Sequence, residues 1–341
     1  MRNGEGDVLI AAKGRFRITL TQIDLNRLWI QCGDEELPRV LTFSQSSERS
    51  AIAFLADAKE ANVQCAGFDM GPGDIVVTPA GTSFHERTSG PCRWRAMSLP
   101  SHDFSAASQA ILGRDQSVGS VAHMVRPDPA DMARLLRLQE ETRRLILTAP
   151  EMDAHHEVLR ALEQALVHAM ITCLAAHMPT EVDRRWRHHS AIIGRFEELL
   201  VKNSDRPMHL PEICAAVRVS ERTLRACCEE HLGMGPIRYL WLRRMHLARR
   251  ALVLGDPAKT TVTQTATEYG FWELGRFAVS YRQLFGEPPS ATLQKSSRGH
   301  RTFRDRPIAF ANAGAAQPNG RSAKLDAHPV NDPAEARATA S

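Results

Sequence analysis

The sequence predicts an α+β protein in which a β-rich N-terminal domain is followed by a helical hairpin and an all-α C-terminal domain. Three observations lead to this prediction. Short apolar runs separated by glycine and proline fill residues 8–100, apolar residues at helical spacing begin near residue 128, and positive charge is concentrated in residues 190–298. At 341 residues the chain is long enough for two or three domains.

The N-terminal region has the pattern of many short strands. Residues 16–20, 28–30 and 74–77 are brief apolar runs, and residues 70–81 place one such run between two turns rich in glycine and proline. Many short strands with such turns are typical of a β-sandwich or a jelly-roll barrel. We therefore expect a β domain over residues 1–125.

Helical periodicity marks the next segment. Residues 128–148 and 151–177 carry leucine and methionine at helical spacing, with charged residues between them. Two such amphipathic helices pack as an antiparallel hairpin or against a partner subunit. We assign residues 126–187 to this hairpin and a charged linker, and we expect the hairpin to support a homodimer. Residues 297–341 lack periodicity and are expected to form a disordered tail.

The composition excludes several classes of protein. With 43% apolar and 24% charged residues the chain has the balance of a globular protein, and no apolar run reaches the ~18 residues of a membrane span. The N-terminus has no apolar segment of a secretory signal, so we expect a cytoplasmic protein that does not enter a membrane. Seven scattered cysteines without a Cys-x-x-Cys pair indicate reduced thiols.

No metal or cofactor site is predicted from the histidines. His155 and His156 are adjacent, as are His188 and His189. Neighbouring side chains on a helix point about 100° apart, which suits a single ion poorly.

The charge of the chain is unevenly distributed. Residues 190–298 hold sixteen Lys and Arg against eleven Asp and Glu, a net charge of +5. The remaining residues hold 27 against 28, a net charge of −1. Positive charge gathered in one segment is what a nucleic-acid-binding module needs, although a surplus of surface arginines would give the same count.

A helix-turn-helix is predicted around residue 218. Pro211 opens a first helix, a tight turn follows near Arg218, and Ser220 caps a second helix. Leu224 and Cys228 lie four residues apart on the buried face of that second helix. In such a motif the second helix enters the major groove of DNA.

The opposite face of this second helix carries the side chains that would reach DNA. Arg222 and Arg225 lie there with Ala226. Each arginine can bond to guanine O6 and N7 or grip a phosphate. The same pattern also fits an ordinary solvated helix face, so this motif alone leaves both interpretations open.

A second copy of the motif favours the DNA-binding interpretation. Cys214 precedes the turn residue Arg218 by four positions, and Ala266 precedes Gly270 by the same interval. One long helix over residues 236–252 would hold the two copies at a fixed separation. The helix after the second turn has Phe277 and Tyr281 on its buried face and Gly275, Val279 and Arg282 on its outward face.

Residues throughout this segment occur at the positions and in the order of a known family. They are Ser220, Thr223, Leu224, Gly233, Met234, Gly235, Pro236, Tyr239, Leu240, Arg244, Met245, Ala248, Arg249, Ala266, Gly270, Phe271, Phe277, Phe285, Gly286, Pro289 and Ser290. With them, residues 191–293 resemble the DNA-binding domain of the AraC/XylS family of bacterial transcription regulators.

The resemblance implies a role for each position, with promoter DNA and RNA polymerase as partners and residues 188–296 as the DNA-binding domain. The positions that would contact bases are Arg222, Arg225, Ala226, Leu274, Gly275, Arg276, Ala278 and Val279. The positions at the DNA backbone are Ser220, Thr223 and Arg282. The cores of the two motifs contain Cys214, Leu224, Cys228, Ala266, Gly270, Phe271, Phe277 and Tyr281.

Four positions depart from the family pattern. Ala226 stands where arginine is common, Cys228 where phenylalanine is usual, Arg218 replaces the turn glycine, and Thr265 replaces an apolar core residue. The second recognition helix is also poor in hydrogen-bonding side chains. We therefore expect the first motif to carry most of the direct readout.

The resemblance also implies a cupin-like N-terminal domain that binds a small-molecule effector or dimerises. The aromatic residues that could line its pocket, and that fit ordinary core packing as well, are Trp29, Phe68, Phe84 and Trp94. His85, Glu86 and His102 lack the ligand spacing of a metal-binding cupin and are interpreted as surface residues.

Two other classes of function are disfavoured. Cys92 lies in a loop similar to the acceptor-cysteine loop of adaptive-response alkyltransferases, but Arg93 stands where the activating histidine would be. We therefore do not expect an enzyme. A purely architectural DNA binder would not need the long non-basic N-terminal region.

Overall fold

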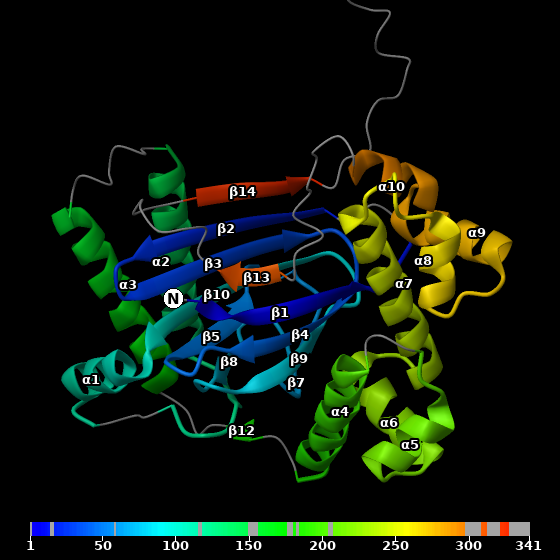
Figure 1. Ribbon diagram of the computed structural model, residues 1–341. Coiled ribbons are helices and arrows are strands. Elements are labelled where there is room, and N and C mark those ends of the chain that lie inside the picture. Colours follow the sequence, from blue (N-terminus) through cyan, green and yellow to red (C-terminus); the bar gives the residue numbers. More distant parts are fainter. Residues whose placement is uncertain are drawn as a thin grey trace, which may run out of the picture.

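The protein consists of a two-sheet β domain with helices on either side of it. The computed structural model describes residues 2–13, 17–57, 59–114, 118–148, 156–175, 180–181, 184–203, 207–296, 308–311 and 321–326. In Figure 1 the helices α1 to α3 lie on one side of the sheets and the helices α4 to α10 on the other. This arrangement confirms the predicted β-rich N-terminal part and all-α C-terminal part.

Two antiparallel sheets form the β domain. Their strands are β1 (Arg2–Ile10), β2 (Arg17–Leu25), β3 (Leu28–Glu35), β4 (Arg39–Gln45), β5 (Arg49–Leu55), β6 (Val63–Cys65), β7 (Phe68–Met70), β8 (Ile75–Thr78), β9 (Ser83–Arg87), β10 (Cys92–Pro100), β11 (His123–Val125), β12 (Thr180–Glu181), β13 (Ile308–Ala311) and β14 (Arg321–Asp326). One sheet has the order β13-β1-β4-β9-β6-β7 and the other the order β12-β11-β8-β5-β10-β3-β2-β14.

The tight hairpins of this domain use left-handed residues. Asn26, with a φ of 63°, lies in the two-residue turn between β2 and β3. Ala66 and Gly67, with φ values of 49° and 97°, form the two-residue turn between β6 and β7. Two-residue turns with positive φ match the twist of paired strands, so they fix the register of both hairpins.

Three helices cover the far side of the sheets. They are α1 (Ser101–Leu112), α2 (Pro129–Thr148) and α3 (His156–Ala175). The apolar stripes of α2 and α3 are buried in one core with strand residues such as Ile52 and Phe54. Most apolar side chains of the hairpin are therefore buried within its own domain. Self-association through the hairpin stays a prediction.

Helix α3 has a composition that the sequence analysis did not anticipate. By length and hydropathy it could cross a membrane, and it is the one such helix among the described residues. Half of its apolar window is buried inside the protein, where Leu166 and Met170 are fully covered. A core helix of a folded domain passes the same composition test.

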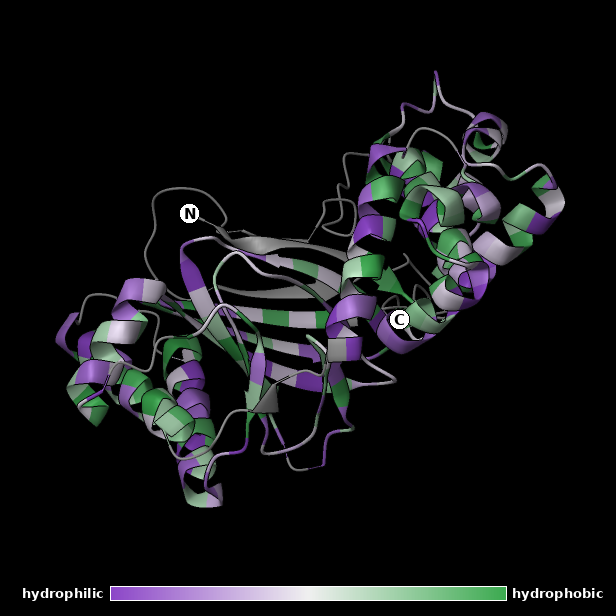
Figure 2. Cartoon of the chain, turned by 90° about the horizontal axis from the view of Figure 1, so that it is seen from below, coloured by the Kyte–Doolittle hydropathy of each residue, from purple (hydrophilic) through white to green (hydrophobic). Residues whose placement is uncertain are grey.

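The C-terminal domain contains seven helices among the described residues. They are α4 (Arg184–Lys202), α5 (Leu210–Val217), α6 (Glu221–Leu232), α7 (Pro236–Leu254), α8 (Val262–Glu268), α9 (Leu274–Phe285) and α10 (Pro289–Ser296). Helix α7 runs from the group of α5 and α6 to the group of α8 to α10 (Figure 1). Figure 2 shows apolar and polar residues banded along the helices at both ends of the molecule.

The two domains meet in a seam of apolar and charged contacts. Leu9 of β1 and Val40 of β4 belong to the same buried cluster as the helices of the C-terminal domain. Glu197 of α4 accepts hydrogen bonds from Thr42 at 3.0 Å and from Tyr239 at 2.6 Å, and it lies 2.7 Å from Nε2 of His85. One carboxylate therefore joins two strands of the β domain to two helices.

The carboxylate of Glu197 is held in its charged form. Burial alone would raise its pKa, but the charge and hydrogen bond of His85 and the hydroxyls of Tyr239 and Thr42 lower the pKa below the usual value.

Parts of the C-terminal tail form strands, although the sequence analysis expects disorder there. β13 pairs with β1 and β14 pairs with β2, each at an outer edge of its sheet. Edge strands offer unpaired backbone groups to any extended segment, which is a constraint that composition does not reveal. The other tail residues lie outside the described part of the chain.

Candidate nucleic-acid interface

The first turn is closed by backbone hydrogen bonds around a left-handed arginine. Arg218 ends α5 with φ 60° and ψ 48°. Its N–H donates to the carbonyl of Ala215 at 3.3 Å, and the N–H of Val219 donates to the carbonyl of Cys214 at 3.1 Å. These bonds satisfy carbonyls at the helix end and direct the chain into α6.

The second helix of the first motif, α6, begins at a serine cap. Ser220 has extended backbone, and its hydroxyl accepts a hydrogen bond from the N–H of Thr223 at 3.1 Å. Leu224 and Cys228 are fully buried, as the helical spacing predicts, and Cys227 is buried with them. Burial raises the pKa of the Cys228 thiol to about 12, so this cysteine acts as an apolar core residue.

The outward face of α6 is open to solvent. Arg222, Arg225 and Ala226 are all exposed. Arg225 lies 3.3 Å from Glu221 one turn earlier, a surface ion pair that contributes little and that a nucleic acid can displace. Among the described residues Arg222 has no ion-pair partner, so its guanidinium is available to a ligand.

The second motif repeats the turn geometry of the first. The N–H of Gly270 donates to the carbonyl of Thr267 at 2.9 Å, and the N–H of Phe271 donates to the carbonyl of Ala266 at 2.9 Å. These bonds connect residues three and five positions apart, as they do at Arg218 and Val219. Gly270 has a φ of 77°, so glycine occupies the left-handed position that Arg218 occupies in the first copy.

Helix α9 has an aromatic buried face. Phe277 and Tyr281 are buried four residues apart, with ring centroids 5.6 Å from each other. Phe271, at the turn, lies 4.9 Å from Phe277 by ring centroids. The three aromatic residues predicted for the core of the second motif are therefore brought together.

The outward face of α9 is mostly apolar. Leu274 and Val279 are 39% and 58% exposed, and nothing lies within 4 Å of a Cβ built on Gly275. Arg276 pairs with Glu273 at 3.2 Å, Arg282 is exposed, and Ala278 is half-buried. Trp272, which no motif in the sequence marks, lies two residues before Leu274 and is 75% exposed. An exposed tryptophan next to two exposed aliphatic side chains suits contact with apolar parts of a partner.

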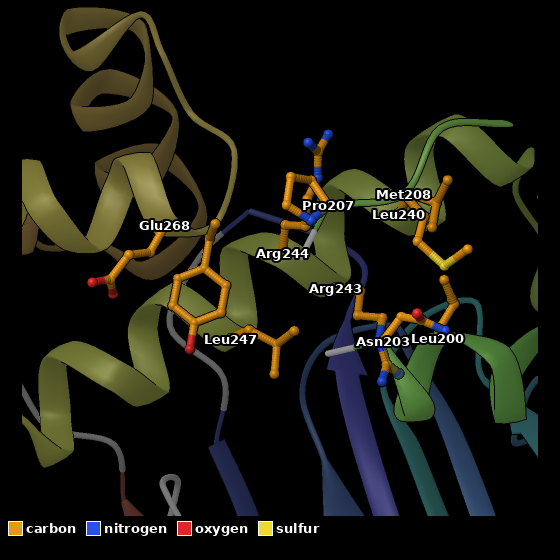
Figure 3. A pocket seen from close by; sticks show the side chains of 10 residues that line it. Leu200, Asn203, Pro207, Met208, Leu240, Arg243, Arg244, Leu247 and Glu268 are labelled. Atoms are coloured by element: carbon orange, nitrogen blue, oxygen red, sulfur yellow. The ribbon is translucent and has the colours of Figure 1, made fainter. Parts of the chain in front are cut away.

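Helix α7 sets the separation of the two motifs. Its 19 residues give a length of about 28 Å, comparable to the ~34 Å of one DNA turn. A cavity of about 30 Å³ lies where α7 meets the second turn, lined by residues such as Pro207, Arg244 and Glu268 (Figure 3). That volume suits about one water molecule, so the cavity is a joint between packed helices rather than a ligand site.

A shallow groove separates the start of α7 from α6. It has a volume of about 430 Å³ and is lined by residues that include Arg225, Arg238 and Trp241. The groove therefore extends the basic surface of the first motif beyond α6.

The four aromatic residues predicted to line an effector pocket do not share one place. Phe68 and Trp94 are buried in one cluster, and Phe84 packs against it. Trp29 lies elsewhere, beneath the guanidinium of Arg49 at 3.8 Å from its ring centroid. Trp94 also donates a hydrogen bond to Glu35 at 2.5 Å. Three of the four therefore belong to one packed core, to which strands of both sheets contribute.

A further cavity lies between the domains. It has a volume of about 410 Å³ and its lining includes Arg39, Gln64, Arg87 and Gly233. Nη1 of Arg39 and Oε1 of Gln64 are buried without a hydrogen-bond partner among the described residues. A cavity of this size with unsatisfied polar atoms can accommodate a small polar molecule.

The residues considered for other chemistry are dispersed. His85 and Glu86 are not surface residues as the sequence suggested, because His85 is buried against Glu197 and Glu86 is largely covered beside Arg39; His102 is exposed next to Asp103. Burial raises the pKa of the Cys92 thiol to about 12, which disfavours the thiolate at neutral pH.

Comparisons with known proteins agree with the helix-turn-helix geometry. The family described as "Helix-turn-helix domain" matches residues 213–295. The "Probable thc operon regulatory protein" of Rhodococcus erythropolis is 37% identical over 156 residues, which cover 43% of this chain and 45% of that protein. The "XylDLEGF operon transcriptional activator 2" of Pseudomonas putida is 34% identical over 99 residues, which cover 29% of this chain and 63% of that protein.

One solved structure is also similar to part of the chain. It is described as a probable AraC family transcriptional regulator from Rhodopseudomonas palustris and is 34% identical. The match covers 31% of this chain and 98% of that one, with a TM-score of 0.29. The chain thus spans less than two thirds of the length of the two curated relatives.

Proposed function

The chain belongs to the AraC/XylS family of transcription regulators, and we propose that it binds promoter DNA in a sequence-specific manner through α6 and α9. One observation carries this proposal. The two motifs close their turns with the same pair of backbone hydrogen bonds, and each presents an exposed helix face after that turn. Two motifs of this kind, joined by one 19-residue helix, can each place a helix in one of two adjacent segments of the major groove.

The two recognition helices are proposed to read DNA by different means. Arg222 and Arg225 of α6 are exposed and can form bidentate hydrogen bonds to guanine. Leu274 and Val279 of α9 can contact thymine methyl groups, while Arg282 suits the phosphate backbone. The proposed reading surface of α9 also includes Gly275, Arg276 and Ala278. The start of α6, with Ser220 and Thr223, is proposed to face the DNA backbone.

We further propose that a small molecule bound by the N-terminal domain controls this DNA binding. The cavity between the domains supports this proposal because its wall includes Arg39 and Gln64 of the β domain and Gly233 at the end of α6. A ligand there touches both domains, so its affinity can depend on their arrangement. The packed cluster around Phe68, Phe84 and Trp94 is the alternative location.

The remaining partners follow from the family. RNA polymerase and a second copy of the chain are proposed partners, with a cytoplasmic location and without enzymatic activity or membrane insertion. Leu147 and Val158, at the tip of the α2–α3 hairpin, are 37% and 38% exposed and offer a surface for self-association. Dimerisation would strengthen binding to repeated half-sites, because it raises the effective concentration of the second DNA-binding domain at its half-site.

Selection of bound sequences from a random DNA pool tests the proposed function. The full-length protein should enrich a motif with two parts separated by about one helical turn. Arg222→Ala should relax the part read by α6 and leave the other part unchanged. Enrichment of no motif by the wild-type protein would contradict sequence-specific binding.

A further inference from the structure

Two histidines and a glutamate converge where α4 meets the end of α6. His189 comes from α4, and Glu230 and His231 are consecutive residues of α6. One ligand atom from each side chain lies within 4.8 Å of the other two. Nδ1 of His189 lies 2.5 Å from Oε2 of Glu230.

His231 is the second, independent observation at this site. Its side chain is buried, with 2% exposure, and neither ring nitrogen has a hydrogen-bond partner in the described structure. Its ring lies against that of Trp186, with centroids 4.1 Å apart. A buried imidazole normally has at least one hydrogen bond. The two ring nitrogens of His231 therefore call for a ligand from outside the described part of the chain.

We infer that His189, Glu230 and His231 form a binding site for a divalent transition-metal ion, of which Zn²⁺ is the best match. Two imidazoles and a carboxylate suit zinc, which takes three such protein ligands and leaves one position open. Zn–N and Zn–O bonds of about 2.0–2.2 Å place tetrahedral ligand atoms about 3.3–3.6 Å apart. Small side-chain rotations bring the three ligand atoms, already within 4.8 Å, to that spacing.

The position of the site favours a cation. Glu230 and His231 lie in the last turn of α6, where the aligned peptide dipoles place partial negative charge. The side chains of His189 and Glu230 are 12% and 30% exposed, so an ion can enter from solvent. Glu230 and His231 are consecutive on α6, an arrangement that suits a single ion poorly in a helix taken alone, but here one ligand atom of each lies within 4.8 Å of the other and of His189 from α4.

The bound ion would tie the recognition helix α6 to α4. Trp186, one helical turn before His189, also reaches the β domain, where a Cβ on Gly67 would lie 2.7 Å from its ring. The ion would therefore hold α6 at the seam between the domains. This inference goes beyond the proposed function and does not depend on DNA binding.

Calorimetric titration of the metal-free, full-length protein with Zn²⁺ tests the site. The comparison uses His189→Ala, Glu230→Gln and the control His188→Ala, which removes an exposed histidine from the neighbouring position. The wild type and H188A should bind one ion with equal affinity. H189A and E230Q should bind more than about tenfold more weakly, because even changes beyond the direct ligands cost 10–100-fold.

Thermal unfolding provides a second measurement on the same proteins. Zn²⁺ should raise the midpoint of the wild type and H188A but not that of E230Q, because an ion bound to the folded state stabilises it. E230Q decides the result if H189A folds poorly, since Glu230 is the most exposed of the three ligands. Absence of binding by the wild type, or full affinity in E230Q, would overturn the assignment.

Discussion

The two helix-turn-helix motifs share one turn geometry but differ in what surrounds them. Both recognition helices end at a left-handed glycine, Gly233 with φ 69° after α6 and Gly286 with φ 77° after α9. A Cβ built on Gly233 would lie 2.2 Å from Nη1 of Arg87 in the β domain, whereas nothing lies within 4 Å of one on Gly286.

The difference indicates that the two motifs have different roles. The first motif packs against the β domain through α4 and α6, so it is placed to respond to changes there. The helices of the second motif, α8 and α9, pack mainly against α7, α10 and each other, and α9 presents a mostly apolar outward face. The substitutions that follow can break or sharpen this comparison.

The largest effect is expected at the carboxylate that joins the domains. Glu197→Gln removes a charged acceptor that serves His85, Tyr239 and Thr42. Hydrogen bonds to charged groups contribute about 1.5–3 kcal/mol, so urea unfolding monitored by tryptophan fluorescence should show a loss of that size. Glu198→Gln is the control, because the side chain of Glu198 is 71% exposed.

The same pair of variants gives a pH dependence. The folded pKa of Glu197 lies below its ordinary value of 4.5, so its contribution is complete above that pH. The contribution is lost as the pH falls through the lowered folded value. Stability of the wild type should therefore decline more steeply below pH 4.5 than that of Glu197→Gln. Parallel acid profiles would show that this carboxylate does not join the domains.

The next effect concerns base reading by the first motif. Arg222→Ala or Arg225→Ala should cost about 1–3 kcal/mol of discrimination at particular base pairs, because a bidentate contact to guanine is lost. Arg282→Ala in α9 should weaken binding to all sequences about equally, as expected for a phosphate contact. Binding to a panel of operator variants measures both, and a uniform loss in all three proteins would contradict the distinction.

The glycines after the recognition helices compare the two motifs directly. Gly286→Ala should cost only the left-handed strain of an alanine, about 1–2 kcal/mol. Gly233→Ala should carry the same strain and additionally displace Arg87 from the end of α6. Thermal unfolding should therefore rank Gly233→Ala as the less stable protein, and equal midpoints would mean that the β domain does not restrain the first motif.

The sequence predicted the helix-turn-helix pair because its determinants are local. Turn residues, caps and buried positions lie within five residues of each other, as the bonds of Val219 and Phe271 show. Helix α1 was not predicted, since it buries only Phe104 and Ser108 and has little apolar periodicity.

Contacts between distant segments were not predictable in the same way. His85 and Glu197 are 112 positions apart, and His189 and Glu230 are 41 apart. No spacing rule connects such residues, because the packing of whole helices and sheets brings them together. The four aromatic residues of the β domain illustrate the same limit, since their strands distribute them over different surroundings.

The smallest effect concerns Arg218, the turn residue that distinguishes the first motif. A non-glycine residue in the left-handed region carries strain of about 1–2 kcal/mol, while glycine costs about 0.4–1 kcal/mol through the entropy of the unfolded chain. Arg218→Gly should therefore stabilise the protein by about 0.5 kcal/mol. Arg218→Ala keeps the strain and should show no gain, which separates the backbone effect from loss of the exposed side chain. Chemical unfolding of the three proteins measures the difference, and equal stability of the glycine and alanine variants would mean that the first turn stores no strain.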